Sequence, residues 1–299
     1  MATVGVRAGL SIDHLVTVDR GARFDQLGGP GLYGTLGARL VEGTSTSLFA
    51  SLPADDNRFA VLFADLGVDV RYCQTVPKVP RVWILNAREG RRIVAISTPG
   101  GVEIEGGTAV GDKDDEGELM YPPTEFYQQL DALFESSPVD APRPEHPITV
   151  GIDPHQIPLR TEGFGYVERV TPPGSVLLPS RVHLLLLDRD PRRAARELAA
   201  RTGGPVVARL DTEGMYIVSS NRNWSVRDSA VNVVETTGAG DSSAAAIVSA
   251  LAIGADLVTA ARFGASVARL ALSGWGHSGL LRSKPLTAPL NNIESKQEL

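Results

Sequence analysis

Short runs of β-branched and apolar residues alternate with helical patterns along most of the chain. The strand-like runs lie at residues 2–6, 14–18, 45–52, 68–76, 146–154, 181–188 and 204–220, and the helix-like runs at 31–43, 55–67 and 190–201. The run at 181–188, RVHLLLLD, is apolar almost throughout, which is typical of a strand covered on both faces. This alternation predicts an α/β fold with a mostly parallel central sheet flanked by helices.

One segment does not fit this alternation. Residues 79–98, VPRVWILNAREGRRIVAIST, hold two apolar runs joined by NAREG, a good hairpin signal. A hairpin pairs its strands antiparallel and cannot continue a series of parallel strands joined by helices. We therefore expect a small β element that stands apart from the main layer.

The length and composition set the broad class. With 299 residues, the chain has room for one large α/β domain and a small appendage. We assign residues 1–285 to that domain and expect a loosely held tail at 286–299, because few apolar residues anchor the C-terminal end. The formal net charge is −6, with no basic run, which argues against a nucleic-acid partner.

Cellular location is inferred from cysteine usage and from the lack of long apolar segments. The single cysteine, Cys73, excludes an intramolecular disulfide and is expected to be a buried structural thiol. No stretch approaches the roughly 18 apolar residues that span a bilayer, and the N-terminal residues lack a cleavage-site pattern. We expect a cytoplasmic protein without a membrane partner.

The stretch ETTGAGDSSAAAIVSALAIG, residues 235–254, carries the clearest chemical signal. Gly238, Ala239 and Gly240 have almost no side-chain bulk and precede an Ala-rich helix, so an anion could approach the unpaired amides at its N-terminus. Asp241 stands in the first turn, where a carboxylate could accept a proton from a substrate hydroxyl. On spacing alone, a helix-capping role is the favoured interpretation of Asp241.

The motif TTGAGD and the two helical stretches that follow resemble the C-terminal signature of the ribokinase or PfkB family of carbohydrate kinases, D-T-x-G-A-G-D-x-F. The resemblance implies that Asp241 is the catalytic base. It also implies that the amides of Gly238, Ala239 and Gly240 form the anion hole. The fold it implies is ribokinase-like, with a small β lid formed from about residues 10–26 and 78–105.

The resemblance extends to the acceptor side. FDQLGGPGLYGTLGARL is similar to the family's N-terminal Gly-Gly motif, here Gly28 and Gly29, which lies against the substrate. LSIDHLV resembles the early strand whose aspartate, here Asp13, holds substrate hydroxyls. Tyr33 stands where the family usually has an asparagine, which indicates a changed substrate pocket or one that stacks against a flatter ligand.

The nucleotide side departs further from the family. The N-x-x-E motif, which follows a strand, is expected at Asp188–Pro191, where Pro191 cannot replace the glutamate. Asp188 is the candidate that would hold Mg²⁺ through water, with Asp190 as the alternative. T-x-G-x-x-G reads RLDTEG, in which Arg209 either meets a phosphate or pairs with Asp211. The expected nucleotide-binding residues are Asp211, Gly214, Thr237 and Ser266.

Together these features predict an ATP-dependent kinase that uses Mg²⁺ and phosphorylates a hydroxyl of a sugar or a sugar-like polyol such as a cyclitol. Two alternatives stay open: a nucleoside kinase, which Tyr33 would suit, and a non-catalytic kinase-like protein that binds a small ligand. The expected partners are the polyol and ATP, and the family resemblance leaves open a homodimer formed through the lid.

Overall fold

The computed structural model describes residues 1–18, 20–87, 90–95, 102–104, 121–138, 148–220 and 222–298. In this part of the chain, a central sheet has nine strands in the order β16-β15-β14-β13-β12-β11-β10-β1-β4. These strands are β1 (Ala2–Arg7), β4 (Thr44–Phe49), β10 (Ala132–Ser136), β11 (Thr149–Asp153), β12 (Val176–Leu177), β13 (Val206–Arg209), β14 (Met215–Val218), β15 (Asn223–Asp228) and β16 (Ile293–Glu298).

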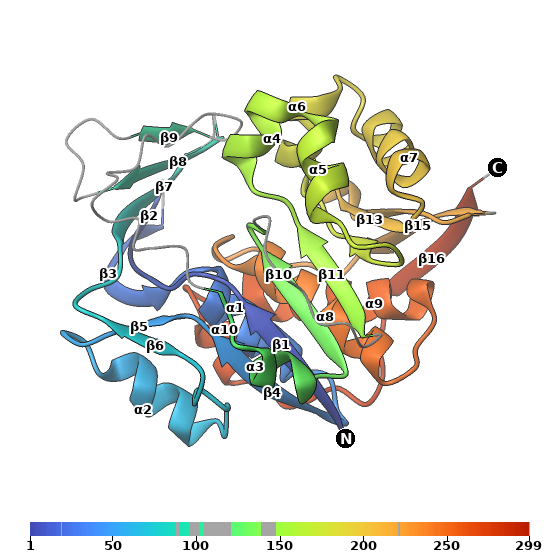
Figure 1. The fold of residues 1–299 in the computed structure, drawn as a ribbon. Coiled ribbons are helices and arrows are strands. Elements are labelled where there is room, and N and C mark those ends of the chain that lie inside the picture. The colour runs from blue at the N-terminus through green and yellow to red at the C-terminus, as the bar shows by residue number, and fades with distance from the viewer. Residues whose placement is uncertain are drawn as a thin grey trace.

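The six strands from β4 to β13 pair in parallel, and β14, β15 and β16 continue the sheet antiparallel. β14 reverses direction because a tight turn follows β13, closed by the Leu210 amide donating to the Gly214 carbonyl. The predicted α/β class with a mostly parallel central sheet is confirmed (Figure 1).

Helices cover both faces of this sheet (Figure 1). One face packs against α1 (Pro30–Ala38), α8 (Ala239–Ala252) and α9 (Leu257–Leu272), with the short α10 (Ser278–Leu281) beside them. The other face carries α3 (Thr124–Gln128), α4 (Gln156–Glu162), α5 (Phe164–Val170), α6 (Arg181–Leu187) and α7 (Pro191–Thr202). The two hydrophobic clusters explain why the inner parallel strands have apolar residues pointing to both sides.

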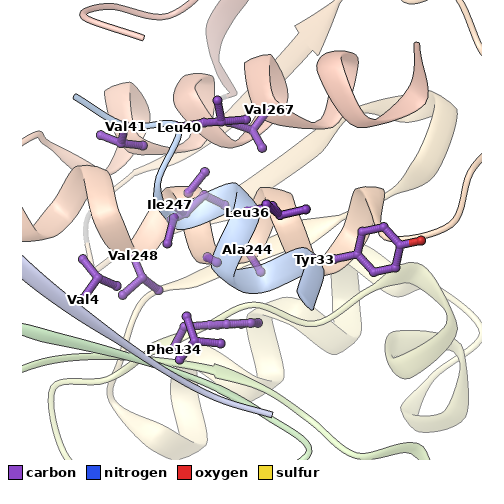
Figure 2. Packing of buried hydrophobic residues seen from close by; sticks show 14 of the residues in the cluster. Val4, Tyr33, Leu36, Leu40, Val41, Phe134, Ala244, Ile247, Val248 and Val267 are labelled. Atoms are coloured by element: carbon purple, nitrogen blue, oxygen red, sulfur yellow. The ribbon is translucent and has the colours of Figure 1, made fainter. Parts of the chain in front are cut away.

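Close packing of small residues fixes α1 and α8 against each other. A Cβ added to Gly37 would lie 2.2 Å from the carbonyl oxygen of Ser242, so the two helix backbones are nearly in contact. Figure 2 shows Leu36 of α1 beside Ala244 and Ile247 of α8, with Val4 of the sheet beneath. The Ala-rich sequence of α8 is therefore a packing requirement, and it fixes the position of the loop that precedes the helix.

A second sheet lies to one side of the central sheet, with strand order β3-β2-β7-β8-β9 (Figure 1). Its strands are β2 (Ser11–Thr17), β3 (Gly21–Gly28), β7 (Arg81–Ala87), β8 (Gly90–Ala95) and β9 (Val102–Ile104). The hairpin expected within residues 79–98 is present as the antiparallel pair β7–β8. Parts of the segments assigned to the lid, at residues 19, 88–89, 96–101 and 105, lie outside the described residues.

A third, two-stranded sheet and one helix complete the architecture described. β5 (Ser51–Pro53) pairs in parallel with β6 (Gln74–Val76), and α2 (Arg58–Asp65) lies between them in sequence. A one-turn 3₁₀ helix, Asp211–Glu213, follows β13. No helix among the described residues has the length and apolar character needed to cross a membrane.

Two predictions about local structure are wrong, and a third, the strand expected at 68–76, is present only as β6 at its end. The apolar run 181–188 forms helix α6, because Ser180 and His183 make a reciprocal capping box at its N-terminus. The expected loose tail instead contains β16, whose residues pair along the full length of β15. The backbone of β16 is held by hydrogen bonds to β15, although most β16 side chains are exposed. A strand with exposed side chains cannot be predicted from the hydrophobic pattern.

Candidate active site

The loop before α8 places the predicted anion hole at an exposed helix N-terminus. Gly238 is the N-cap residue and has φ 76°, a left-handed conformation that suits glycine. The helix begins at Ala239, Gly240 is exposed, and Asp241 lies in the first turn. A carboxylate here interacts favourably with the helix dipole, so Asp241 suits the helix as well as the proposed chemistry.

Tyr33 is the residue that requires a glycine at position 238. A Cβ on Gly238 would lie 1.9 Å from the Tyr33 ring, which is only 1% exposed. The Tyr33 hydroxyl is buried without a hydrogen-bond partner. Burial raises the pKa of Tyr33 well above its usual value, and the charges of Asp13, Glu235 and Asp241 raise it further. The ring face is thus occupied by the chain itself, which does not favour the expected stacking against a ligand.

Asp13 is a buried carboxyl near the same loop. Its side chain is close to Gly28, since a Cβ there would lie 1.9 Å from Asp13 Oδ2, and the Ser11 hydroxyl donates to Oδ1 at 2.6 Å. Burial raises the pKa of Asp13 to about 6, and the nearby charges of Glu235 and Asp241 add to the increase. The structure thus brings Asp13 and Asp241 into one electrostatic environment.

The Gly-Gly motif brings the start of the second sheet against α1. Gly29 has φ 88°, and a Cβ on it would lie 2.7 Å from the Gly9 carbonyl oxygen and from the backbone of Leu10. The Gly31 amide donates to the Gly9 carbonyl at 2.7 Å. These contacts hold the segment that leads into β2, and therefore help to set the position of Asp13.

Glu235 links the anion-hole loop to the second sheet. Its Oε1 accepts hydrogen bonds from the Asn86 amide group at 2.9 Å and from the amide and hydroxyl of Thr237 at 2.8 and 2.6 Å. Its Oε2 accepts from the Gly276 amide at 3.3 Å. Thr237, expected on the nucleotide side, thus directs its hydroxyl at Glu235. No pattern in the sequence indicates that Asn86 reaches this loop.

The other expected nucleotide-side residues do not form one group. Asp211, with φ 52°, and Gly214, with φ 85°, stand in the exposed turn after β13. Ser266 is fully buried in α9, where its hydroxyl donates to the Arg262 carbonyl at 2.8 Å and accepts from the Leu290 amide at 2.9 Å. Ser266 therefore has a packing role in this structure.

Asp188 does not have the surroundings of a metal ligand. Its two carboxylate oxygens accept from Nε and Nη2 of Arg193 at 2.7 and 2.6 Å, and Oδ1 also accepts the Asp190 amide. Because residues 181–187 are helical, Asp188 follows a helix, and the nearest preceding strand is β12. Among the described residues, no group of three His, Cys, Asp or Glu side chains is arranged to hold a metal ion.

A buried charged cluster lies at the carboxyl ends of two parallel strands. Asp153 ends β11 and Arg209 ends β13, and Nη2 of Arg209 lies 2.6 Å from Oδ2 of Asp153. His183 of α6 approaches the other carboxylate oxygen at 3.4 Å. Sequence reasoning did not single out Asp153, although a charged residue at the end of an apolar parallel strand is the available signal, because ligands bind at that edge in α/β sheets.

Comparison with protein families supports the resemblance noted in the sequence. Residues 188–281 match the model of the pfkB family carbohydrate kinases, and this span includes the TTGAGD motif, α8 and α9. A curated relative from Archaeoglobus fulgidus, described as an uncharacterized sugar kinase, is 31% identical over 137 residues. The match covers 45% of this chain, and the chain spans about half of that relative, 54% of its length.

Solved structures extend the likeness to nearly the whole chain. The aminoimidazole riboside kinase of Salmonella enterica, solved with aminoimidazole riboside and an ATP analogue, superposes with a TM-score of 0.70 at 20% identity, covering 95% of this chain and 97% of that one. An E. coli protein assigned as a ribokinase II, solved with ATP and Mg²⁺, gives a TM-score of 0.67 at 16% identity, covering 92% and 94%. The fold is ribokinase-like, and the predicted resemblance to the PfkB family is confirmed.

Proposed function

We propose that this chain is an ATP-dependent kinase that phosphorylates a hydroxyl of a sugar or of a sugar-like polyol such as a cyclitol. The observation that carries the proposal is the gathering of Asp13 and Asp241 around an exposed helix N-terminus at Gly240. One carboxyl suits the binding of hydroxyl groups and the other suits the removal of a proton. The family match over residues 188–281 supports the same assignment.

In the proposed reaction, Asp13 holds the acceptor beside Gly28 and Gly29. Asp241 takes the proton of the attacking hydroxyl while the hydroxyl oxygen of the acceptor bonds to the γ-phosphorus of ATP. The bond from that phosphorus to ADP breaks, and its electron pair stays on the ADP oxygen. The amides at Gly238–Gly240 stabilise the negative charge on the transferring group. Movement of the second sheet over the acceptor would exclude water, which otherwise competes as an acceptor.

The residues present suit the binding of ATP phosphates, but the candidate Asp188 does not suit the binding of Mg²⁺. The exposed amides at the start of α8 suit a phosphate, and the turn at Asp211–Gly214 is the proposed place for the rest of the nucleotide. Asp188 does not suit Mg²⁺, because Arg193 engages both of its oxygens. Mg²⁺ bound mainly by ATP phosphates and water would neutralise phosphate charge, in keeping with its preference for few protein ligands.

The test is ADP release with Mg²⁺-ATP across a panel of sugars, cyclitols and nucleosides, with Asp241→Asn assayed in parallel. We expect acceptor-dependent turnover that Asp241→Asn lowers by at least about 10²-fold, because a positioned base contributes that much or more. Asp65→Asn, a change at an exposed carboxylate in α2, is the matched control and should keep wild-type turnover.

The alternative outcomes are distinct. Turnover with nucleosides alone would replace the polyol by a nucleoside as the acceptor. Absence of turnover on every acceptor, together with thermal stabilisation of both wild type and Asp241→Asn by one of them, would identify a ligand-binding protein and overturn the kinase proposal. Equal turnover of the two proteins would remove Asp241 from the role of base.

A further inference from the structure

Arg209 reaches from the central sheet to the N-terminus of α8. It is the last residue of β13 and only 7% exposed. Its Nε and Nη2 donate to the carbonyl of Leu178 at 3.0 and 2.6 Å, and Nη2 lies 2.6 Å from Oδ2 of Asp153. A Cβ built on Gly240 would lie 3.0 Å from Nη1. The guanidinium is therefore fixed on one edge and meets the exposed glycine of the anion hole with the other.

This position is electrostatically unfavourable for the protein alone. The N-terminus of a helix carries a partial positive charge, so a cation beside it is repelled. Burial of a guanidinium away from water adds to the cost, and Asp153 offsets it on the far side of the group from Gly240. An anion bound between Nη1 and the α8 amides would make both positive groups favourable. The arrangement therefore suits a negatively charged ligand, in addition to the Asp241 carboxylate already in the first turn of α8.

Asp153 gives Arg209 a fixed orientation. Burial raises the pKa of Asp153, but the charge of Arg209 and the contact with His183 outweigh it and hold that pKa below its usual value. Asp153 Oδ1 is buried without a hydrogen-bond partner, and the nearest His183 atom, Nδ1, accepts the Ser180 amide at 3.2 Å. Asp153 thus directs its charge to Arg209 and holds one edge of the guanidinium, which leaves Nη1 to donate to a phosphate oxygen.

We propose that Arg209 is a catalytic residue that binds the transferring phosphoryl group through Nη1. Asp153 is then the positioning residue that orients the Arg209 guanidinium. This rests on the proposed kinase function. Arg209 forms no bond and transfers no proton in the step. It stabilises the charge on the oxygens of the phosphorus while the bond to ADP breaks, the bond to the acceptor forms and Asp241 receives the proton.

The experiment uses a double variant, Asp153→Asn with Arg209→Met, because Arg209→Met alone would leave Asp153 buried and unpaired. Arg209→Lys keeps the charge without the planar fork. The control is the double variant Asp228→Asn with Arg269→Met, which removes another partly buried ion pair, between β15 and α9. Circular dichroism and thermal unfolding first establish that each variant is folded.

In turnover, the Asp153/Arg209 double variant should lose about 10²–10³-fold in kcat, the effect typical of removing one donor to a developing anion. The acceptor KM should stay within about two-fold, since the acceptor site is proposed at Asp13 and not at Arg209, and Arg209→Lys should recover part of kcat. The control double variant should keep wild-type kcat. A folded Asp153/Arg209 variant with wild-type kcat would overturn the proposal.

A second readout does not depend on turnover. Inorganic tripolyphosphate, which has the phosphate chain without the nucleoside, should raise the melting temperature of the wild type and of the control but not that of the Asp153/Arg209 double variant. Equal shifts in all three proteins would overturn the role of Arg209. If the wild type binds tripolyphosphate through Arg209 but phosphorylates no acceptor, the kinase proposal fails while the anion site stands.

Discussion

Asp13 provides a quantitative test of the site, because its burial makes stability depend on pH in an unusual direction. The pKa of Asp13 is raised from 3.8 to about 6 in the folded protein. This increase corresponds to about 3 kcal/mol in favour of the protonated carboxyl over the ionised one. The largest cause is burial, which Asp13→Asn keeps while removing the titrating group.

The sign follows from proton binding in the two states. Between about pH 4 and pH 6, the unfolded chain has lost the Asp13 proton while the native protein still holds it, so native stability falls as pH rises. Relative to Asp13→Asn, the wild type should therefore lose about 3 kcal/mol of unfolding free energy between about pH 4 and pH 7. Above the folded pKa of about 6, the difference between the two proteins should level off.

The assay is urea unfolding of wild type and Asp13→Asn at half-unit steps of pH, with the unfolding free energies compared at each step. Asp65→Asn, at an exposed position, serves as the control and should follow the wild type. Parallel pH profiles for wild type and Asp13→Asn would refute the reasoning. A wild type that gains stability over Asp13→Asn as pH rises would show that the folded protein stabilises the ionised carboxylate and lowers its pKa.

Two further predictions concern packing and reactivity. Gly238→Ala should destabilise the protein by about 3 kcal/mol in denaturant unfolding. The new Cβ would clash with the buried Tyr33 ring, and the backbone at this position is left-handed. Gly165→Ala is the control and should be neutral or slightly stabilising, because no atom lies within 4 Å of its Cβ. Equal effects of the two substitutions would contradict this contact. Burial raises the pKa of Cys73 to about 11, and the thiol of this half-buried residue donates to the Leu48 carbonyl at 3.2 Å. Little thiolate is therefore present at neutral pH, so a thiol reagent should modify the native protein much more slowly than the unfolded chain, and equal rates would contradict this.

Much of the architecture was readable from the sequence, because the relevant signals are local. Alternating strand and helix patterns predicted the α/β class, and NAREG predicted the β7–β8 hairpin. The GAG turn predicted the start of α8, since small residues before an Ala-rich run are typical of a helix entered through a close-packed loop. The family resemblance carried by TTGAGD was likewise contained in the sequence.

The sequence failed where a short-range pattern supports two structures. RVHLLLLD suits a buried strand by composition, but the capping box between Ser180 and His183 starts a helix there. The tail has few apolar residues, yet β15 offers its backbone a ladder of hydrogen bonds. The metal candidate Asp188 was placed by its position after an expected strand, and that segment is a helix.

What only the tertiary structure decided is which charges face each other. Asp13, Glu235 and Asp241 lie far apart in sequence or on different elements, and their mutual effect appears only when β2 and the α8 loop come together. Asn86 reaches Glu235 across 149 residues, and Arg209 pairs with Asp153 from a neighbouring region of the same sheet edge. Side-chain electrostatics act through space, so the sequence could supply these groups but not their distances.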